Sequence, residues 1–590
     1  MSDQFIAQFA ELLVNHYLRL TTRDLDEWHT DPETWLINEA ADHWELSLRP
    51  CAEKMYIQLT NKYRHCLLPL IYRALRASIH DQTTPDKVLA TDAFYTSIGI
   101  CAHELFDAIN YNEWIVNKLI PETALQGDFG TVLRRRVLWL LDALVDVSLN
   151  RETRRQVYQL LQDMVQPSQH LVVRMTTVAT LHTWVDSLEF YPSDFSPHVE
   201  AILTGLTHLL QSLSETECRM KVVNLLSLIS DRMEHRVAPY ANALIGVIGS
   251  VWTDATEEHL LCSAILVALA KLVRSLGPMS VDYHELLARL IHYSAQSDAY
   301  GFGYLLEDGL TLWVALLRHT PSMSPSLLAL LPDLFRQTDR ELVVCQDMLR
   351  LVRHYLVLDA PLVLKTTGAD TYQFIGRLIT ECDTEIATHI GRALEVIPQC
   401  APVDLYGPAL VASGLFHHTM NTICSNEAMA YMNVALVGFL ARIIIQDTAF
   451  FLQAVDHSQQ EVEGVDVLDQ LLATWLDVHD CMMHPKHRKL STLALTLIVG
   501  TGRPAALRNF PAVVGIWTGF LNEFQENDQG DVPAYWKPDE FDQEEEDEDT
   551  TETCNPSTGR LSKVTYESQQ QLLFNDMSKK LINGGPFLMI

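Results

Sequence analysis

Acidic side chains crowd into one short stretch near the end of the chain. Nine of the eleven residues from Asp539 to Asp549 are carboxylates: Asp539, Glu540, Asp542, Glu544, Glu545, Glu546, Asp547, Glu548 and Asp549. A run of this density raises the local concentration of cationic peptides, so it predicts a binding segment for basic partners. A solvated acidic segment without a dedicated partner has the same composition, and both interpretations stay open.

A basic stretch lies further upstream, at Lys486, Arg488 and Lys489, with His487 between them. Cations grouped this closely could contact an acidic protein surface. Alternatively, they pair with neighbouring acidic side chains at the start of a helix. We treat the three as candidate partner-binding residues.

The same region holds side chains of the types that bind metals, namely Asp477, His479, Cys481, His484 and His487. Zinc sites usually need paired CxxC or HxxxH spacing on tight turns, which this string lacks. The chain also has no P-loop, no GxSxG motif and no glycine-rich dinucleotide turn. We therefore expect no catalytic residue, no cofactor and no metal, and a protein that is not an enzyme.

The elements that carry these residues repeat along the chain. Pro197, Pro239, Tyr283 and Pro325 each mark the start of an apolar helical segment, at intervals of about 42 to 44 residues, the period of HEAT-type helical hairpins. A second helix follows each start. The predicted pairs are 196–213 with 217–233, 238–251 with 257–275, 281–294 with 303–319, and 324–337 with 340–357.

Apolar residues in the second helices recur at helical spacing, and two stripes are the clearest: Val222, Leu225, Leu226, Ile229 and Met233, then Leu261, Ala264, Ile265, Ala268, Leu269 and Leu272. No segment alternates with period two. The pattern predicts an all-α chain, a HEAT-repeat α-solenoid that winds as a right-handed superhelix of hairpins. Such arrays usually hold another macromolecule on a long surface.

Composition limits the partners. The 590 residues are 48% hydrophobic and carry a formal net charge of −32, so the bulk field would repel nucleic acid and attract basic proteins. Eleven cysteines without a CxxC pair indicate a reducing compartment. The apolar runs 260–273 and 432–445 are shorter than a bilayer span, and the first residues do not read as a signal peptide. We expect no membrane insertion and a location in the nucleus and cytoplasm.

The predicted organisation has three parts. Residues 1–524 form the solenoid, clearest over 133–357, with a helix at 1–20, a polar loop at Thr21–Asp31 and later hairpin arms at 384–399, 405–422 and 426–446. Residues 525–560 are acidic and predicted to be disordered. Residues 561–590 form a tail in which Gln569–Ile582 could make a short helix.

Two groups of residues are expected to be structural. Arg134, Arg135 and Arg136 lie near a helix start, where the macrodipole disfavours cations, so we expect acidic partners on an adjacent repeat to hold them. Tryptophans on the predicted helices are expected in the core: Trp35, Trp44, Trp139, Trp184, Trp252 and Trp313.

Several long strings together resemble the importin-β (karyopherin) family of nuclear transport receptors over about residues 10 to 540. They are WHTDPETWL (28–36), WELSLRPCAE (44–53), LRRRVLWLLDALVDV (133–147), HLVVRMTTVATLHTWVDSLEFY (170–191), YLLEDGLTLW (304–313) and HPKHRKLSTLAL (484–495). They match the middle and C-terminal part of such a receptor. The resemblance therefore leads us to expect a chain without the family's N-terminal block, the main binding region for the GTPase Ran.

The resemblance implies a receptor that carries protein cargo through nuclear pores at the nuclear envelope, and the net negative charge leads us to expect basic cargo. It implies contacts with Phe-Gly nucleoporins on the outer helices and cargo release by Ran in its GTP form, with Ran binding weakened or absent here. Cargo would lie on the inner surface, built by second helices such as 217–233 and 257–275. The alternative is a HEAT-repeat scaffold that assembles a protein complex without transport activity.

Overall fold

The structure is a computed structural model of the chain. It describes residues 2–40, 47–77, 84–106, 109–255, 258–296, 302–335, 342–381, 384–425, 430–459 and 466–526. Within these ranges every regular element is helical and no strand occurs, which confirms the prediction of an all-α chain. The predicted acidic segment and C-terminal tail lie outside the described residues from position 527 onward.

Contacts divide the chain into two compact units, Met1–Leu276 and Gly277–Ile590, and each is described by itself. The α-helices of unit 1 are α1 (Asp3–Leu12), α2 (Thr22–Thr30), α3 (Pro32–Ala40), α4 (Leu48–Lys62), α5 (Arg64–Ala77), α6 (Pro85–Gly99), α7 (Tyr111–Trp114), α8 (Ile120–Glu122), α9 (Asp128–Ala143), α10 (Arg151–Met164), α11 (Leu171–Asp186), α12 (Pro192–Phe195), α13 (Val199–Ser212), α14 (Thr216–Met233), α15 (Ala241–Asp254) and α16 (His259–Leu276). Short π-helical turns continue α1 and α7, at Leu13–Tyr17 and Ile115–Leu119.

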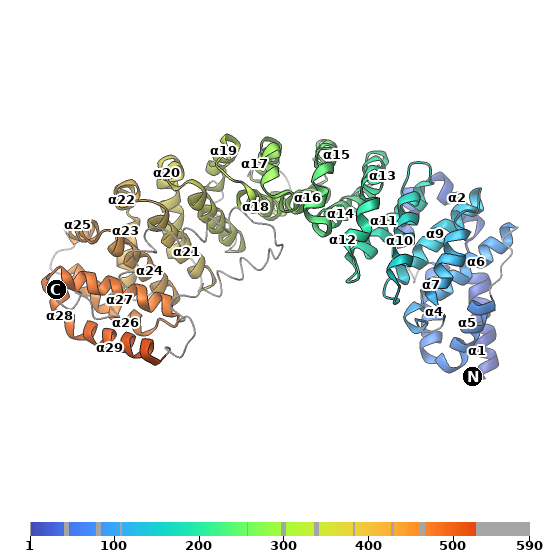
Figure 1. Cartoon of the computed structure of the whole chain (residues 1–590), viewed down its shortest axis with the longest axis horizontal. Helices are drawn as coiled ribbons and strands as arrows, with labels where there is room; N and C mark the ends of the chain where they lie inside the picture. The colour runs from blue at the N-terminus through green and yellow to red at the C-terminus, as the bar shows by residue number, and fades with distance from the viewer. Residues whose placement is uncertain are drawn as a thin grey trace. The chain divides into compact units, whose positions relative to one another are not determined.

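The α-helices of unit 2 are α17 (His284–Ser294), α18 (Phe302–His319), α19 (Pro325–Phe335), α20 (Leu342–Glu381), α21 (Thr384–Cys400), α22 (Val403–Ala412), α23 (Leu415–Ser425), α24 (Ala430–Gln446), α25 (Thr448–Gln459), α26 (Val467–Asp480), α27 (Pro485–Gly500), α28 (Pro504–Arg508) and α29 (Phe510–Glu526). Figure 1 shows them in chain order, from yellow-green to red.

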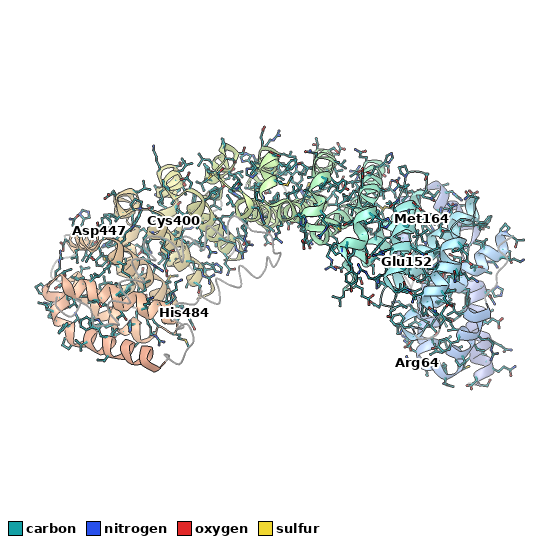
Figure 2. The ribbon with its side chains drawn as sticks, viewed as in Figure 1. Arg64, Glu152, Met164, Cys400, Asp447 and His484 are labelled. Carbon is teal, nitrogen blue, oxygen red and sulfur yellow. The ribbon has the colours of Figure 1, made fainter. Side chains whose placement is uncertain are left out.

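Each unit is a stack of helical hairpins in two layers (Figures 1 and 2). In unit 1, α9, α11, α14 and α16 pack successively in one layer, and α13 packs on α15 in the other. In unit 2, α18, α20, α21, α24, α27 and α29 form the corresponding chain of contacts. We call these two series the inner layers. This arrangement is that of a HEAT-type α-solenoid, as the sequence period predicts.

The predicted repeat starts coincide with short turns that open the first helix of a hairpin. Pro197 and Pro239 lie in 3₁₀ turns that lead into α13 and α15, Tyr283 ends a 3₁₀ turn before α17, and Pro325 is the first residue of α19. Proline suits a first turn because its fixed φ is helical and its missing N–H would have no partner there. The four predicted hairpins are confirmed, since α13 packs on α14, α15 on α16, α17 on α18 and α19 on α20.

Two predicted boundaries are wrong. The segment predicted as a polar loop, Thr21–Asp31, is mostly helix α2, which Thr21 and Asp24 start with reciprocal capping hydrogen bonds. The predicted single arm 405–422 is two helices, because Gly414 adopts a left-handed φ of 79° between α22 and α23. Helix α20 spans Leu342–Glu381, but its backbone is non-helical at Asp359, two residues after the end of the predicted helix 340–357, so this end agrees with the prediction.

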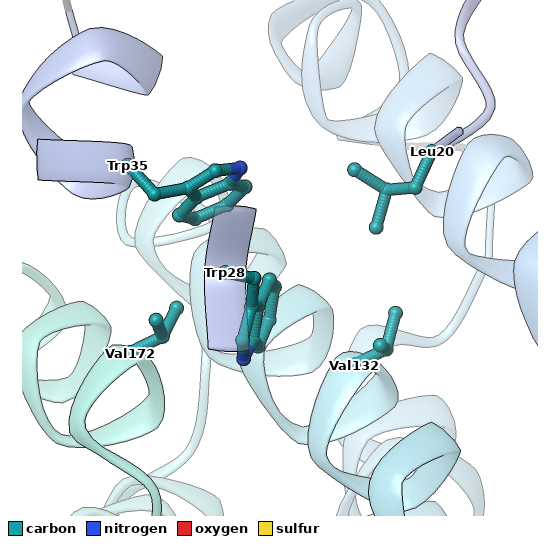
Figure 3. Close-up of a cluster of buried hydrophobic side chains, with 5 residues drawn as sticks. All are labelled: Leu20, Trp28, Trp35, Val132 and Val172. Carbon is teal, nitrogen blue, oxygen red and sulfur yellow. The ribbon is translucent and has the colours of Figure 1, made fainter. Parts of the chain in front are cut away.

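A strap formed by α2 and α3 (residues 22–40) leaves the order of the hairpins and packs on the inner layer of unit 1. Trp28 and Trp35, with ring centroids 4.8 Å apart, are buried in a cluster with Leu20, with Val132 of α9 and with Val172 of α11. Figure 3 shows the two indoles among these aliphatic side chains. Aromatic burial of this kind contributes strongly to stability, so the strap is an integral part of the core of unit 1.

The strap also reaches α14 through Glu33, which is 8% exposed. Its carboxylate accepts hydrogen bonds from the backbone N–H of Ser214 (3.1 Å), the hydroxyl of Ser214 (2.9 Å) and the backbone N–H of Glu215 (2.8 Å). These donors lie just before the first residue of α14, where N–H groups lack intrahelical partners and the helix dipole favours an anion. A side chain 181 residues away in sequence thus caps this helix.

Carboxylates from other helices hold two of the three consecutive arginines of α9. Arg136 donates to Asp92 of the neighbouring helix α6 (2.7 Å), as predicted, and Arg135 donates to Glu39 of the strap rather than of an adjacent repeat (2.7 Å). Arg134 differs from the prediction, because it donates to the backbone carbonyls of Thr123 (2.9 Å) and Leu125 (2.8 Å). Of the predicted core tryptophans, Trp35, Trp184, Trp252 and Trp313 are buried, Trp139 is half-buried, and Trp44 lies outside the described residues.

Ile265→Asp tests nearest-neighbour packing in α16. Ile265 is fully buried, so an unpaired carboxylate there should cost about 4 kcal/mol or more, or unfold the hairpin locally. Hydrogen exchange should show lost protection centred on α14 to α16. Leu260→Asp, at an exposed position of the same helix, is the matched control. Uniform loss of protection along the whole chain would contradict a one-dimensional array.

Glu33→Ala tests the cap that the strap places on α14. Removing the acceptor strands backbone donors, which should cost about 1–3 kcal/mol and speed amide exchange at residues 214–218. Asp26→Ala, at an exposed carboxylate of the same strap, should change stability by less than about 0.5 kcal/mol. Unchanged exchange at the start of α14 in the Glu33 variant would argue against a capping role.

Candidate protein-interaction surface

The inner layer of unit 1 is only partly open to solvent. The strap packs on α9, in which only the first residue, Asp128, is exposed, and it contacts α11 and α14. Beyond the strap, the solvent-facing stripe of α14 carries Glu217, Lys221, Asn224 and Asp231. Helix α16 adds Lys271 and Arg274 beside it. The part of the predicted cargo surface that remains open in unit 1 is therefore the outward stripe of α14 and α16.

Ion pairs organise the charges on this stripe. Lys221 lies 2.7 Å from Glu217 one turn earlier on α14, and Lys271 of α16 lies 3.5 Å from Asp231 of α14. Exposed pairs of this kind contribute little to stability and can exchange partners readily. The stripe is thus a polar surface of mixed sign, to which a ligand with its own charges of both signs could bind.

The basic stretch of unit 2 begins α27, near the position of His484 in Figure 2. His484 caps this helix, since its Nδ1 accepts the backbone N–H of Lys486 at 3.2 Å, and Pro485 occupies the first helical position. Lys486 and Arg488 are half-buried, whereas Lys489 is only 1% exposed. Lys489 therefore packs inside unit 2, and among the three candidates only Lys486 and Arg488 keep part of their surface open to a partner.

The carboxylate of Glu395 on α21 explains why cations gather here. His487 Nε2 lies 3.8 Å from Glu395 Oε1, and Arg442 Nε of α24 lies 3.5 Å from Glu395 Oε2. Burial opposes ionisation of Glu395, but the nearby Lys486 and Arg442 outweigh it and hold the pKa of this carboxyl below its usual value. The basic stretch thus ties three successive inner helices, α21, α24 and α27, which favours the pairing interpretation for His487 and Lys486.

A comparable buried cluster surrounds Glu39 in unit 1. Burial would raise the pKa of Glu39, yet Arg135 and Arg49 together hold it below its usual value. The guanidinium carbon of Arg135 also lies over the ring of Trp35, 5.1 Å from its centroid.

The sequence analysis identified the arginines but missed their acidic partners Glu39 and Glu395 and the capping residue Glu33. Trp28 and Trp35 lie on two different helices, separated at Asp31, so helical spacing along the sequence gave no signal for the strap.

The potential metal ligands of the sequence do not assemble into a site in the described part of the chain, where no three His, Cys, Asp or Glu side chains meet in a metal-binding group. His479 instead shares the Ser491 hydroxyl, at 2.9 Å from its Nδ1, with the indole N–H of Trp475 at 2.8 Å. The acidic residues Asp539 to Asp549 lie outside the described residues.

Among the described helices, one stretch, His259–Ser294, has the length and apolar composition of a membrane span, and 56% of its most apolar window is buried within the structure.

Comparison with known proteins identifies related sequences. Human importin-11 is 28% identical over 530 residues, which cover 89% of this chain and 54% of importin-11. The importin beta-like protein KAP120 of Saccharomyces cerevisiae is 24% identical, over 91% of this chain and 56% of its own length. The chain thus spans about half the length of the curated relatives it matches.

Solved structures confirm the fold. The structure of Lph2, described as a bidirectional nuclear transport receptor of S. cerevisiae, superposes with a TM-score of 0.86 at 20% identity and covers 99% of this chain and 62% of Lph2. The exportin Cse1 in its cargo-free state gives a TM-score of 0.58 at 12% identity, over 98% of this chain and 64% of Cse1. At these identities the likeness concerns the helical-repeat fold.

The family model described as "Importin-11-like, TPR repeats" matches residues 263–562, just over half of the chain. TPR and HEAT repeats are both arrays of helical hairpins, so this description agrees with the hairpin stacks of the two units. The matched range begins in α16 and includes the inner layer of unit 2, with Glu395, Arg442 and the basic stretch of α27. The chain belongs to the importin-11-like family.

Proposed function

We propose that this chain works as a non-enzymatic nuclear transport receptor that binds protein cargo and Phe-Gly nucleoporins and shuttles between cytoplasm and nucleus through the pores. Membership of the importin-11-like family carries the proposal. The hairpin architecture supports it, because a stack in which each hairpin contacts only its neighbours can change curvature when a partner binds. Release of cargo by Ran in its GTP form is part of the proposal.

Cargo would bind the inner layers. In unit 1, the strap already occupies α9, so the proposed contact surface is the outward stripe of α14 and α16 with its exchangeable ion pairs. In unit 2, Arg488 at the start of α27 is the proposed charged contact, because Lys486 acts on the buried carboxylate of Glu395. The carboxylates from Asp539 to Asp549 would attract basic segments of cargo, since the whole chain carries a net charge of −32.

A second candidate function is a HEAT-repeat scaffold that assembles a protein complex without transport. The polar, mixed-sign stripe of α14 and α16 suits a scaffold as well as a receptor. Phe-Gly binding separates the two, because a receptor must bind nucleoporin repeats and a scaffold need not.

The chain should bind Phe-Gly repeat peptides weakly, and the binding should tolerate salt because the contacts are apolar. A pull-down on immobilised Phe-Gly repeats, with a Phe→Ser repeat as the control matrix, measures this. Retention on the Phe-Gly matrix alone supports the receptor. Equal retention on both matrices, or none on either, would favour the scaffold function over the transport receptor.

Deleting residues 539–549 should leave Phe-Gly binding unchanged and reduce low-salt association with a basic peptide cargo, since only the second interaction depends on that charge. Affinity measurements at low and physiological salt, with a deletion of eleven residues from 550–560 as a length control, test this. Equal loss of both interactions in the acidic deletion would mean that the segment acts through the fold rather than through its charge.

A further inference from the structure

The outward stripe of α14 and α16 has an apolar centre between charged ends. On α16 one line of exposed or half-buried residues recurs at spacings of four and three: Leu260, Ala264, Val267, Lys271 and Arg274. Leu260 is 67% exposed, although every other leucine of α16 is buried. The apolar part of this line is therefore presented to solvent instead of being used in the core of unit 1.

A second line runs along α14 with the same spacing: Glu217, Lys221, Asn224, Leu228 and Asp231. These residues are also exposed or half-buried. The two helices are neighbours in the inner layer of unit 1 and pack extensively on each other. We call the two lines of residues together the α14–α16 surface.

Ion pairs fix the register of the two lines. Near one end Arg219 lies 3.9 Å from Glu258, and near the other end Asp231 lies 3.5 Å from Lys271. Both pairs join residues that are almost equally far apart in the sequence, so α14 and α16 run parallel. With this offset the apolar residues of both lines adjoin at the centre of the surface: Leu228, Ala264 and Val267.

An apolar centre with a charged rim is the layout of a protein–protein contact. The rim of the α14–α16 surface contains the pair of Lys221 with Glu217, at 2.7 Å, and the pair of Lys271 with Asp231. Exposed pairs contribute little to stability, so they can open and pair with a ligand that covers the centre. The surface can thus bind a partner without disturbing the core.

Arg274 determines which charge the partner needs at one end. It is exposed near the C-terminus of α16, and no hydrogen bond or ion pair joins it to another residue in the part of the chain that the structure describes. A carboxylate of a partner could pair with Arg274 without first displacing an internal partner. Charge complementarity therefore places an acidic residue of the partner at this end.

The spacing of the two lines favours a helical ligand. Successive residues of each line are three or four positions apart, which is about 5 Å along a helix axis. A helix that lies alongside repeats its own apolar face at the same interval. An extended strand presents alternate side chains about 6.7 Å apart and would lose register within two or three of them. Because acidic residues favour the first turn of a helix, a bound helix would run antiparallel to α16 and begin at Arg274.

We propose that the α14–α16 surface binds an amphipathic helix of a protein cargo, with apolar side chains over Leu260 and Val267 and a carboxylate of its first turn at Arg274. The inference rests on the proposed receptor function and names the kind of cargo segment that this part of unit 1 takes. Recognition here depends on apolar contact and on an acidic residue, and so differs from attraction of basic cargo by the net negative charge of the chain.

A peptide of defined sequence tests the proposal with the full-length chain. The probe is a fluorescent, alanine-based peptide of about 16 residues, long enough to follow the surface as a helix. It carries glutamates in its first turn and three leucines that continue the same face at spacings of four and three. A peptide with serines in place of the leucines is the control. Fluorescence anisotropy should show binding of the leucine peptide at least about ten-fold tighter than that of the serine peptide. Equal affinity of the two, or no binding of either, would overturn the proposal.

Variants of the chain locate the contact. Leu260→Asp should weaken binding of the leucine peptide at least about ten-fold, whereas Leu188→Asp, at a fully exposed leucine elsewhere in unit 1, should not change it. Arg274→Glu should weaken binding at least about three-fold at low salt and improve binding of a peptide with lysines in place of the glutamates. Arg236→Glu, at an exposed arginine away from the surface, should do neither. Unchanged affinity in the Leu260→Asp variant would place the peptide elsewhere and overturn the proposal.

Photo-crosslinking provides an independent readout. A benzophenone amino acid at position 224, in place of the exposed Asn224, should crosslink to the leucine peptide, and the same amino acid at position 188 should not. Crosslinks from position 224 to a second copy of the chain would overturn the proposal in favour of self-association.

The Phe-Gly pull-down separates this inference from the receptor function on which it rests. Retention on the Phe-Gly matrix without binding of the leucine peptide would overturn the helix site alone. Binding of the leucine peptide at Leu260 without Phe-Gly retention would support the helix site and contradict the receptor function.

Discussion

The wide apolar stripe on every inner-layer helix is the constraint on which both units depend. In α14, Val222, Leu225 and Ile229 are fully buried, but the first helix of the same hairpin, α13, could cover only part of that stripe. The neighbouring inner helices α11 and α16 cover the rest. Stability is therefore a sum of terms between adjacent hairpins, and a hairpin at the end of the series keeps an apolar face until something covers it.

Buried charges set the register between these helices. Arg136 with Asp92, Arg135 with Glu39 and Arg442 with Glu395 each join different helices of a unit. A buried ion pair adds little net stability compared with apolar packing, yet separating its members is costly. Sliding one helix along its neighbour would leave a buried charge unpaired. These pairs thus penalise wrong registers in a layer where apolar stripes alone would tolerate several.

The sequence predicted the parts of the fold that depend on local pattern. The stripes of α14 and α16 and the turns at Pro197, Pro239 and Pro325 follow from residue type and spacing, and the structure has them where the pattern indicates. The strap was missed because its exposed side, with Asp26 and Glu27, is as polar as a loop, and only tertiary burial of Trp28 shows its role. For the same reason Lys489 could not be separated from Lys486 and Arg488: spacing along one helix does not reveal that a neighbouring helix covers one of them.

The strap changes how unit 1 can respond to a partner. In a simple array, bending is shared among all hairpin junctions because each hairpin touches only the next. The strap adds contacts that skip along the series, from Trp28 and Trp35 on α9 and α11 to Glu33 at the start of α14. Bending between α9 and α14 would have to break these contacts together, and beyond the strap the junction of α14 with α16 is held by the extensive packing of these two helices and by exposed pairs such as Lys271 with Asp231. The strap and this packing therefore stiffen unit 1 from α9 to α16, and the outward stripe of α14 and α16 lies on a rigid part of the unit.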